Sequence, residues 1–228
     1  MSTWPALKAD EIAAVMFDLD GTLVDTMGGF ADLAALVMAA RHGADPVEAR
    51  ARYLQTSGIP FCKQLEVIYP GHAANQAASD EFEARKLAVC EAAMMDADTL
   101  TGLRALAADG LKLVVSSNTG QPVVQTFLDR EGFPFDLALG FDPAIGLAKG
   151  EPHVAQVCAR FGVARHQLLF VGDSLKDAEL AQAAGVPFVG RLGTFSAADF
   201  RRQNPQAATV ANVIELPSLL AAARGSHP

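Results

Sequence analysis

Residues 13–25, AAVMFDLDGTLVD, carry the pattern that decides the fold of this chain. The apolar run Ala13–Phe17 passes directly into Asp18, Asp20 and Gly21. Short apolar runs that end in polar residues are typical of buried parallel strands with chemistry at their carboxyl ends. Two carboxylates at i and i+2 point to the same side of a strand and repel each other unless a cation or a proton is shared. Taken alone, the acids are better explained as a cap of the next helix.

Further apolar runs alternate with helical patterns along the chain. Strand–helix alternation of this kind predicts an α/β fold with a doubly wound parallel sheet. The expected strands are Ala13–Phe17, Leu111–Val115, Leu168–Val171 and the short Phe188–Val189, and the expected helices include Thr119–Glu131, Pro152–Phe161, Leu175–Ala184 and the terminal Leu216–Arg224.

One stretch, Met27–Ala97, interrupts this alternation. It contains no convincing strand, only alanine-rich and amphipathic helical patterns separated by glycine and proline. A crossover between neighbouring parallel strands needs a single helix, whereas this stretch has room for about four. We therefore interpret it as an inserted helical subdomain; the alternative is a set of long crossover helices on the sheet itself.

Polar residues follow the second and third predicted strands as well. Ser116–Gly120 (SSNTG) offers hydroxyls and amides at a helix start, where anions bind readily, and Gly172–Asp177 (GDSLKD) offers two more carboxylates. Lys149 precedes a predicted helix. Each group alone is explained equally well by helix capping or by a solvated lysine. Ligands of parallel sheets bind outside the carboxyl ends of the strands, so the convergence of these groups favours a functional site.

Composition limits the possible partners and compartments. The chain has 228 residues, 50% of them hydrophobic, and a formal net charge of -8, which disfavours binding to nucleic acid. Three dispersed cysteines form no pattern for zinc or for a disulfide framework. Residues 1–10 show no secretory signal and no window is apolar enough to span a membrane, so we expect a soluble, cytoplasmic protein without a membrane partner.

These motifs resemble those of the haloacid dehalogenase superfamily, within it the phosphatases that carry a helical cap after the first strand. The resemblance covers nearly the whole chain, through DLDGTLVDT (18–26), SSN (116–118), Lys149 and GDSLKD (172–177). It implies a Rossmann-like catalytic core of residues 1–26 and 98–228. It also implies a helical cap of residues 27–97 that selects the substrate.

The resemblance also implies roles for the acids. Asp18 would attack phosphorus and form an aspartyl-phosphate. Asp20 would protonate the leaving alcohol and then activate water. Mg²⁺ would be held by Asp18, by the backbone carbonyl of Asp20 and by Asp173, with Asp177 acting on the metal directly or through water.

The phosphoryl oxygens would be held by Ser117 and Lys149, supported by Asn118. In the common pattern proline follows the lysine, but here the run is Lys-Gly-Glu-Pro-His (149–153), which leaves Lys176 as a less suitable alternative. Independently of the resemblance, Thr22 is expected to hold its loop by hydrogen bonds. The five histidines form no pattern, although His153 follows Lys149 closely.

Asp20 separates the possible activities. Dehalogenases of this fold lack an acid at this position, and phosphonate-cleaving relatives replace it and use a cap lysine, so Lys63 and Lys86 are interpreted as surface residues. The leading hypothesis is hydrolysis of a small phosphomonoester of the phosphoglycolate or sugar-phosphate type. A phosphomutase resembling β-phosphoglucomutase is the alternative enzyme, and a non-catalytic phosphate-ligand binding protein is the alternative of another class.

Neither the substrate nor the oligomeric state follows from the sequence. The most polar turn of the predicted cap is the place where we expect substrate contacts, and it comprises Gln55, Thr56, Ser57 and Gly58. Arg50 and Arg52 lie nearby and are candidates for contact with an acidic substrate.

Overall fold

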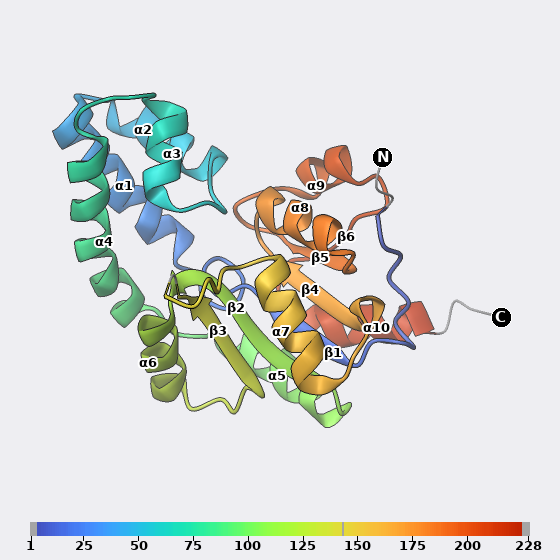
Figure 1. Cartoon of the computed structure of the whole chain (residues 1–228). Coiled ribbons are helices and arrows are strands. Elements are labelled where there is room, and N and C mark those ends of the chain that lie inside the picture. Colours follow the sequence, from blue (N-terminus) through green and yellow to red (C-terminus); the bar gives the residue numbers. More distant parts are fainter. Residues whose placement is uncertain (1–3, 143, 225–228) are drawn as a thin grey trace. The chain divides into compact units, whose positions relative to one another are not determined.

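The computed structural model describes residues 4–142 and 144–224 (Figure 1). Its internal contacts divide the chain into two compact units. One contains the residues up to Val24 and those from Met94 onward, and the other is Asp25–Ala93. The two division points lie within a few residues of the boundaries expected from the sequence. The roles of the two parts, catalysis and substrate selection, remain predictions.

The first unit is built on one parallel sheet with the strand order β3-β2-β1-β4-β5-β6. β1 lies in the middle, where Phe17 pairs in register with Val115 of β2 and Val171 of β4. The predicted α/β fold with a parallel sheet is confirmed. The strands are β1 (Ala14–Phe17), β2 (Lys112–Gly120), β3 (Leu137–Phe141), β4 (Leu168–Gly172), β5 (Phe188–Arg191) and β6 (Ala208–Val210).

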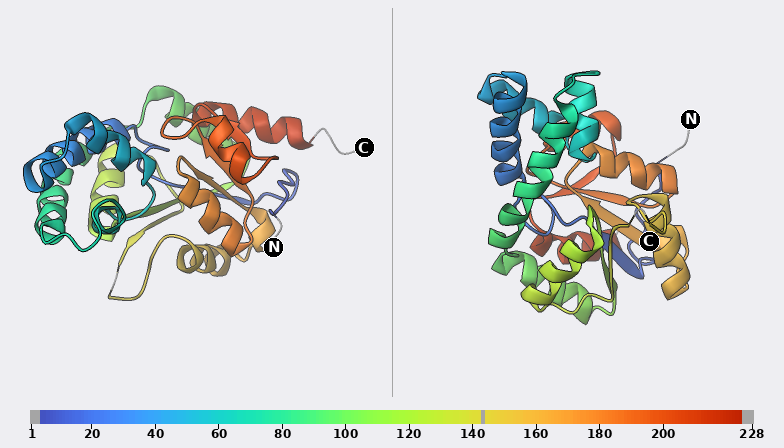
Figure 2. Two further views of the ribbon diagram at one scale, coloured as in Figure 1. Left: turned by 90° about the horizontal axis from the view of Figure 1, so that it is seen from above. Right: turned by 60° about the vertical axis from the view of Figure 1, so that its left-hand side comes forward.

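Helices cover both faces of this sheet (Figures 1 and 2). On one face, residues of α7, α8 and α9 join β1 and β4 in a single buried cluster that includes Met16 and Phe170. On the other face, α5 packs against α10 and the short helix η2. The helices of this unit are α5 (Ala97–Ala108), α6 (Gln121–Glu131), α7 (Glu151–Phe161), η1 (Arg165–Gln167), α8 (Leu175–Ala184), α9 (Ala197–Gln203), η2 (Val213–Glu215) and α10 (Leu216–Arg224).

The second unit consists of four helices around a core of its own, as the sequence predicts. The aromatic rings of Tyr53, Phe61 and Phe82 pack together at its centre. Aromatic rings bury large apolar areas, so such a cluster stabilises a small helical unit efficiently. The helices are α1 (Met27–His42), α2 (Pro46–Gln55), α3 (Phe61–Ile68) and α4 (Asn75–Ala92).

Two strands and one strand end differ from the sequence-based expectation. β3 and β6 lie at the two edges of the sheet, are short and are only partly buried, so neither shows the continuous apolar run of a central strand. β2 was expected to end before Ser116, but it continues to Gly120 because Ser116 and Gly120 still pair with β3. The polar residues of this segment therefore lie on a strand rather than on a helix cap.

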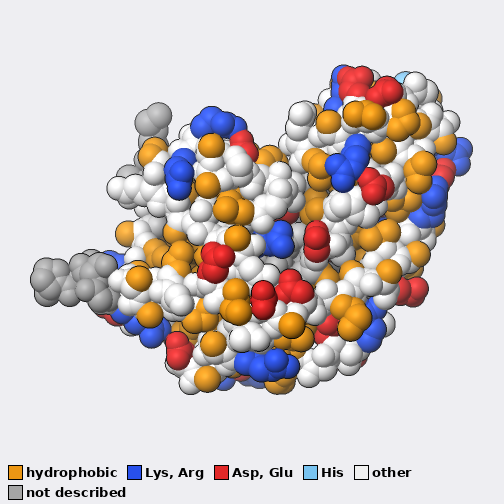
Figure 3. Space-filling model, turned by 180° about the vertical axis from the view of Figure 1, so that it is seen from behind, with side chains coloured by type: hydrophobic (Ala, Val, Ile, Leu, Met, Phe, Trp, Pro, Cys, Tyr) orange, Lys and Arg blue, Asp and Glu red, His pale blue; other side chains and the backbone are white. Residues whose placement is uncertain are grey.

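Within the described ranges, no helix is both long enough and apolar enough to cross a bilayer. On the face shown in Figure 3, lysine and arginine side chains are interspersed with acidic ones rather than gathered into a basic patch.

Candidate active site

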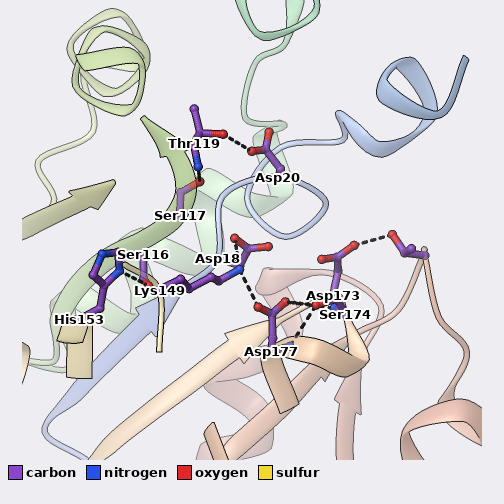
Figure 4. A network of polar contacts seen from close by, with 11 residues as sticks. Asp18, Asp20, Ser116, Ser117, Thr119, Lys149, His153, Asp173, Ser174 and Asp177 are labelled. Atoms are coloured by element: carbon purple, nitrogen blue, oxygen red, sulfur yellow. Dashed lines mark hydrogen bonds and ion pairs between the residues drawn. The ribbon is translucent and has the colours of Figure 1, made fainter. Parts of the chain in front are cut away.

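The carboxyl ends of β1, β2 and β4 bring the predicted site residues into one region (Figure 4). Asp18 directly follows β1, Ser117 lies near the end of β2, and Asp173 directly follows β4. The three strands are neighbours in the sheet. Because their apolar residues are buried, polar side chains are accommodated only toward the strand ends. Asp18, Ser117 and Asp173 are themselves at most 5% exposed.

Lys149 connects two of the acids. Its ammonium lies 2.7 Å from Oδ1 of Asp18 and 2.6 Å from Oδ1 of Asp177. The next residue, Gly150, has a φ of 104°, whereas proline is fixed at about -65°. Glycine at position 150, in place of the common proline, therefore adopts a backbone conformation that proline cannot adopt. Lys149 nevertheless pairs with Asp18. The alternative, Lys176, instead pairs with Glu179 at 2.9 Å.

Asp177 is fixed at the start of α8 by a reciprocal capping arrangement. The Ser174 hydroxyl donates to Oδ2 of Asp177 at 2.7 Å, and the Asp177 backbone amide donates to the Ser174 hydroxyl at 3.1 Å. Capping of this kind explains the spacing of Ser174 and Asp177, whereas the sequence suggested only a helix cap somewhere in this segment. It leaves the second carboxylate oxygen for Lys149, so the same residue serves the helix and the site.

Asp173 is held from the other side by Thr194. The Thr194 hydroxyl, in the loop after β5, donates a short hydrogen bond to Oδ2 of Asp173. A hydrogen bond to an ionised carboxylate favours its charged form and fixes its orientation. Thr194 had no signal in the sequence, because it lies outside every recognised motif.

Burial and mutual repulsion disturb the titration of this group of acids. Burial raises the pKa of Asp18 well above its ordinary value; Lys149 opposes the shift, and Asp177 and Asp173 add to it. Burial and the charge of Asp177 raise the pKa of Asp173 to about 7, against the hydrogen bond from Thr194. Burial alone would lower the pKa of Lys149, but Asp177 and Asp18 outweigh it, so the lysine remains charged.

The donor set fits a divalent cation. Asp18, Asp173 and Asp177 each offer an oxygen, and these atoms all lie within 4.8 Å of one another. With all three acids ionised, three carboxylates against one ammonium leave a formal charge of about -2 in a buried place, which is unfavourable without a further cation and accounts for the raised pKa values of Asp18 and Asp173. Hard cations such as Mg²⁺ prefer carboxylate oxygens. The sequence left open whether Asp177 would act on the metal directly or through water. In the structure its carboxylate lies in the same group of oxygens as those of Asp18 and Asp173.

The side chain of Asp20 points toward Thr119 on β2 rather than toward the three acids. Its Oδ2 accepts a hydrogen bond of 3.0 Å from the hydroxyl of Thr119, whose backbone amide donates to Oγ of Ser117 at 3.0 Å. Asp20 is partly exposed, and its side chain is absent from the group of three acids. A carboxyl group placed away from a metal can still carry a proton. Thr119 is a residue that sequence reasoning assigned only to a helix start.

The loop after β1 is held by its backbone. Gly21 has a φ of 85°, as expected, and its amide donates to the carbonyl of Val24 at 2.7 Å. The hydroxyl of Thr22 is buried and has no partner among the described residues. The predicted side-chain hydrogen bonds from Thr22 are therefore wrong, since backbone bonds already close this turn. Asn118 lies partly buried on β2, beside Ser117.

The polar turn of the second unit is organised around a buried glutamine. The single hydrogen of the Thr56 hydroxyl has two acceptors, Oε1 of Gln64 at 2.9 Å and the carbonyl of Arg52 at 2.8 Å, so it is engaged within its own unit. Ser57, next to Gly58, is buried, and its hydroxyl has no partner in the described part of the chain. Gln55 is exposed.

The charged candidates of this unit are largely surface residues. Arg50 pairs with Asp32 at 2.7 Å and Arg52 with Glu48 at 2.6 Å. Lys63 is exposed, as expected. Lys86 is partly buried, because its ammonium packs 4.9 Å from the centre of the Phe30 ring.

Comparison with known proteins decides the family. The model of the haloacid dehalogenase-like hydrolases matches residues 12–185, which include both acid motifs and Lys149. The chain belongs to this family. The match confirms the predicted family and enzyme class, a phosphatase of the haloacid dehalogenase type.

Curated relatives of this enzyme include phosphoglycolate phosphatases. That of Escherichia coli K12 is 31% identical over 213 residues, covering 80% of this chain and 82% of the relative. That of Photorhabdus laumondii is 31% identical over 191 residues, covering 78% and 80%.

Solved structures share the fold. A haloacid dehalogenase-like family hydrolase from Streptococcus pneumoniae has a TM-score of 0.78 at 19% identity, with 92% of this chain and 99% of that chain covered. A subfamily IA hydrolase from Geobacter sulfurreducens has a TM-score of 0.60 at 23% identity, with 92% and 97% covered.

Proposed function

We propose that this enzyme is a Mg²⁺-dependent phosphatase that hydrolyses a small phosphomonoester of the phosphoglycolate or sugar-phosphate type. The observation that carries the proposal is the group of three buried carboxylates beside the ends of β1 and β4, two of which, Asp18 and Asp177, pair with Lys149. The names of the curated relatives place 2-phosphoglycolate first among the substrates to test. A non-catalytic role is disfavoured because Asp18, Asp20 and Asp173 are all present.

Asp18 is the proposed nucleophile. One of its carboxylate oxygens forms a bond to phosphorus while the bond from phosphorus to the ester oxygen breaks, which leaves an aspartyl-phosphate. Burial at the end of β1 and the ion pair with Lys149 fix the carboxylate in one orientation. Holding the nucleophile in place lowers the entropic cost of the attack.

Asp20 is the proposed acid and base. It donates a proton to the ester oxygen as the alcohol leaves, and it then takes a proton from the water that hydrolyses the aspartyl-phosphate. The hydrogen bond from Thr119 fixes the orientation of this carboxyl group.

Charge on the phosphoryl group is met by Lys149, with Ser117 and Asn118 as further donors. The raised pKa of Lys149 keeps its ammonium charged throughout the neutral pH range. Fixed donors in a buried place stabilise developing charge more strongly than water does. Mg²⁺ would be held by Asp18, Asp173, the Asp20 carbonyl and, directly or through water, Asp177, and when bound it would neutralise negative charge on the phosphoryl oxygens.

Substrate selection is assigned to the second unit, with the turn of Gln55, Thr56, Ser57 and Gly58 as the proposed contact. The buried, unpartnered hydroxyl of Ser57 is the feature that supports this assignment, since a buried polar group without a partner is uncommon. Thr56 contributes by holding the turn through Gln64.

The test is release of phosphate from 2-phosphoglycolate, glycerol phosphate and hexose phosphates, with Mg²⁺ and with a chelator. Asp18→Asn is the diagnostic variant, and Asp129→Asn, on the exposed surface of α6, is the matched control. We expect turnover that requires Mg²⁺, is lost in Asp18→Asn and is kept in Asp129→Asn. Interconversion of hexose phosphates without phosphate release would instead identify a mutase, and the absence of both reactions would overturn the proposal.

A further inference from the structure

Behind the phosphoryl-binding residues lies a completely buried histidine that the mechanism does not use. His153 and Ser116 are both 0% exposed. Nδ1 of His153 lies 2.8 Å from Oγ of Ser116 (Figure 4). Nε2 lies 3.2 Å from the carbonyl oxygen of Gly140. The imidazole therefore joins α7, β2 and β3 through two hydrogen bonds.

The partners determine the state of the ring. A carbonyl oxygen only accepts, so Nε2 must carry a hydrogen and donate it to Gly140. Burial lowers the pKa of His153 to about 4, with a further contribution from the charge of Lys149 and opposition from the Gly140 carbonyl, so the ring is neutral near pH 7. Nδ1 is then an acceptor, and the hydroxyl of Ser116 donates to it. Both ring nitrogens are used in a defined direction.

His153 and its partner Ser116 each lie close in sequence to a phosphoryl-binding residue. Ser116 directly precedes Ser117 on β2, and Lys149 lies four residues before His153, just ahead of α7. Successive strand residues point to opposite faces, so Ser116 can be held from the α7 side while Ser117 remains available at the strand end. We propose that His153 is a positioning residue that fixes Ser117 and Lys149 relative to each other.

The inference rests on the proposed phosphatase function, because it assigns His153 to the same phosphoryl-binding site. Without the imidazole, the buried Ser116 hydroxyl would lose its acceptor and the Gly140 carbonyl would lose a donor. The end of β2 and the start of α7 would then separate or shift. A displacement of about 1 Å at a phosphoryl-binding group lowers the rate by up to about 100-fold.

Three variants test the role. His153→Phe keeps a planar ring, although a slightly larger one, and removes both hydrogen bonds. His153→Gln restores a donor and an acceptor on one side chain. Ser116→Ala removes only one partner and disturbs the fold least. Val157→Ala is the matched control, since Val157 is 0% exposed on the same helix and belongs to the apolar core cluster.

The measurements are kcat and KM, the Kd of inorganic phosphate in the presence of Mg²⁺ by calorimetry, and the Tm. We expect His153→Phe to lower kcat/KM by about 10- to 100-fold and to weaken phosphate binding, with recovery in His153→Gln. We expect the double variant Ser116→Ala/His153→Phe to be no worse than His153→Phe, because the two residues share one hydrogen bond. Val157→Ala should lower the Tm without this loss of kcat/KM.

Each outcome bears on the inference. If the parent enzyme is active and His153→Phe and Ser116→Ala stay within about twofold of it, the inference fails and the phosphatase function stands. Equal losses in Val157→Ala and His153→Phe would also overturn it. If the parent enzyme hydrolyses nothing but binds phosphate, and His153→Phe weakens that binding, the inference stands and the proposed function fails. Absence of both turnover and phosphate binding would overturn both.

Discussion

The ammonium of Lys149 lies 2.7 Å from the carboxylate of Asp18, although 131 positions separate these residues in the sequence. Both side chains are buried, and the same ammonium also pairs with Asp177. The lysine is thus the counter-charge of these acids and, as proposed, of the phosphoryl group during the reaction.

Replacement of Lys149 by methionine keeps the length of the side chain and removes its charge. We expect kcat/KM to fall by about 100-fold or more, because a fixed donor to the phosphoryl oxygens is lost. When a chelator removes Mg²⁺, the Tm of the variant should fall as well, because removing one partner of a buried ion pair lowers the free energy of unfolding by about 3–5 kcal/mol. Mg²⁺ should recover part of this stability. Lys176→Met, at a partly exposed pair with Glu179, is the control and should leave kcat/KM nearly unchanged.

Asp20→Asn should separate substrates by their leaving groups. Alkyl phosphates need a proton on the departing oxygen, so their hydrolysis should fall by about 100- to 10,000-fold. p-Nitrophenyl phosphate has a good leaving group, so its first step should fall much less and a phosphorylated enzyme should accumulate. Quenched-flow detection of the phosphoenzyme measures this. Equal losses for both substrates in the rate of phosphoenzyme formation would contradict the assigned role.

Thr194→Val removes the hydrogen bond that Asp173 accepts and keeps the shape of the side chain. We expect the Mg²⁺ concentration for half-maximal activity to rise by about 10-fold or more, because residues that orient metal ligands affect affinity to this extent. kcat at saturating Mg²⁺ should change little. Thr126→Val, which removes a hydroxyl bonded to the carbonyl of Pro122 on α6, is the control. An unchanged Mg²⁺ requirement would contradict the prediction.

The pKa of His153 predicts a dependence of stability on pH. The folded protein has a pKa of about 4 at this ring and the unfolded chain has about 6.5, so between these values the unfolded chain binds more protons. The free energy of unfolding should therefore fall as the pH drops from 6.5 to 4, by up to about 3 kcal/mol from this residue. Urea unfolding at pH 7 and pH 4.5 measures the effect. His153→Gln should show a smaller loss, and an identical loss would contradict the assignment.

Much of the fold follows directly from local sequence patterns. The central strands β1 and β4 are continuous apolar runs because both of their faces are covered, so the sequence alone locates them. α8 and α10 begin and end where their patterns predict. The edge strands β3 and β6 could not be located, because partly buried strands need no continuous apolar run.

The sequence by itself determined the family, the α/β core with an inserted helical unit, and the acids at the ends of β1 and β4, because these features depend on residue type and spacing along one segment. Only the tertiary structure decided that Lys149 rather than Lys176 pairs with Asp18, that Thr119 and Thr194 hold Asp20 and Asp173, and that His153 joins Ser116 to Gly140. Each of these contacts joins segments far apart in the chain. Such contacts form only where the sheet brings its strand ends together, so no local pattern encodes them.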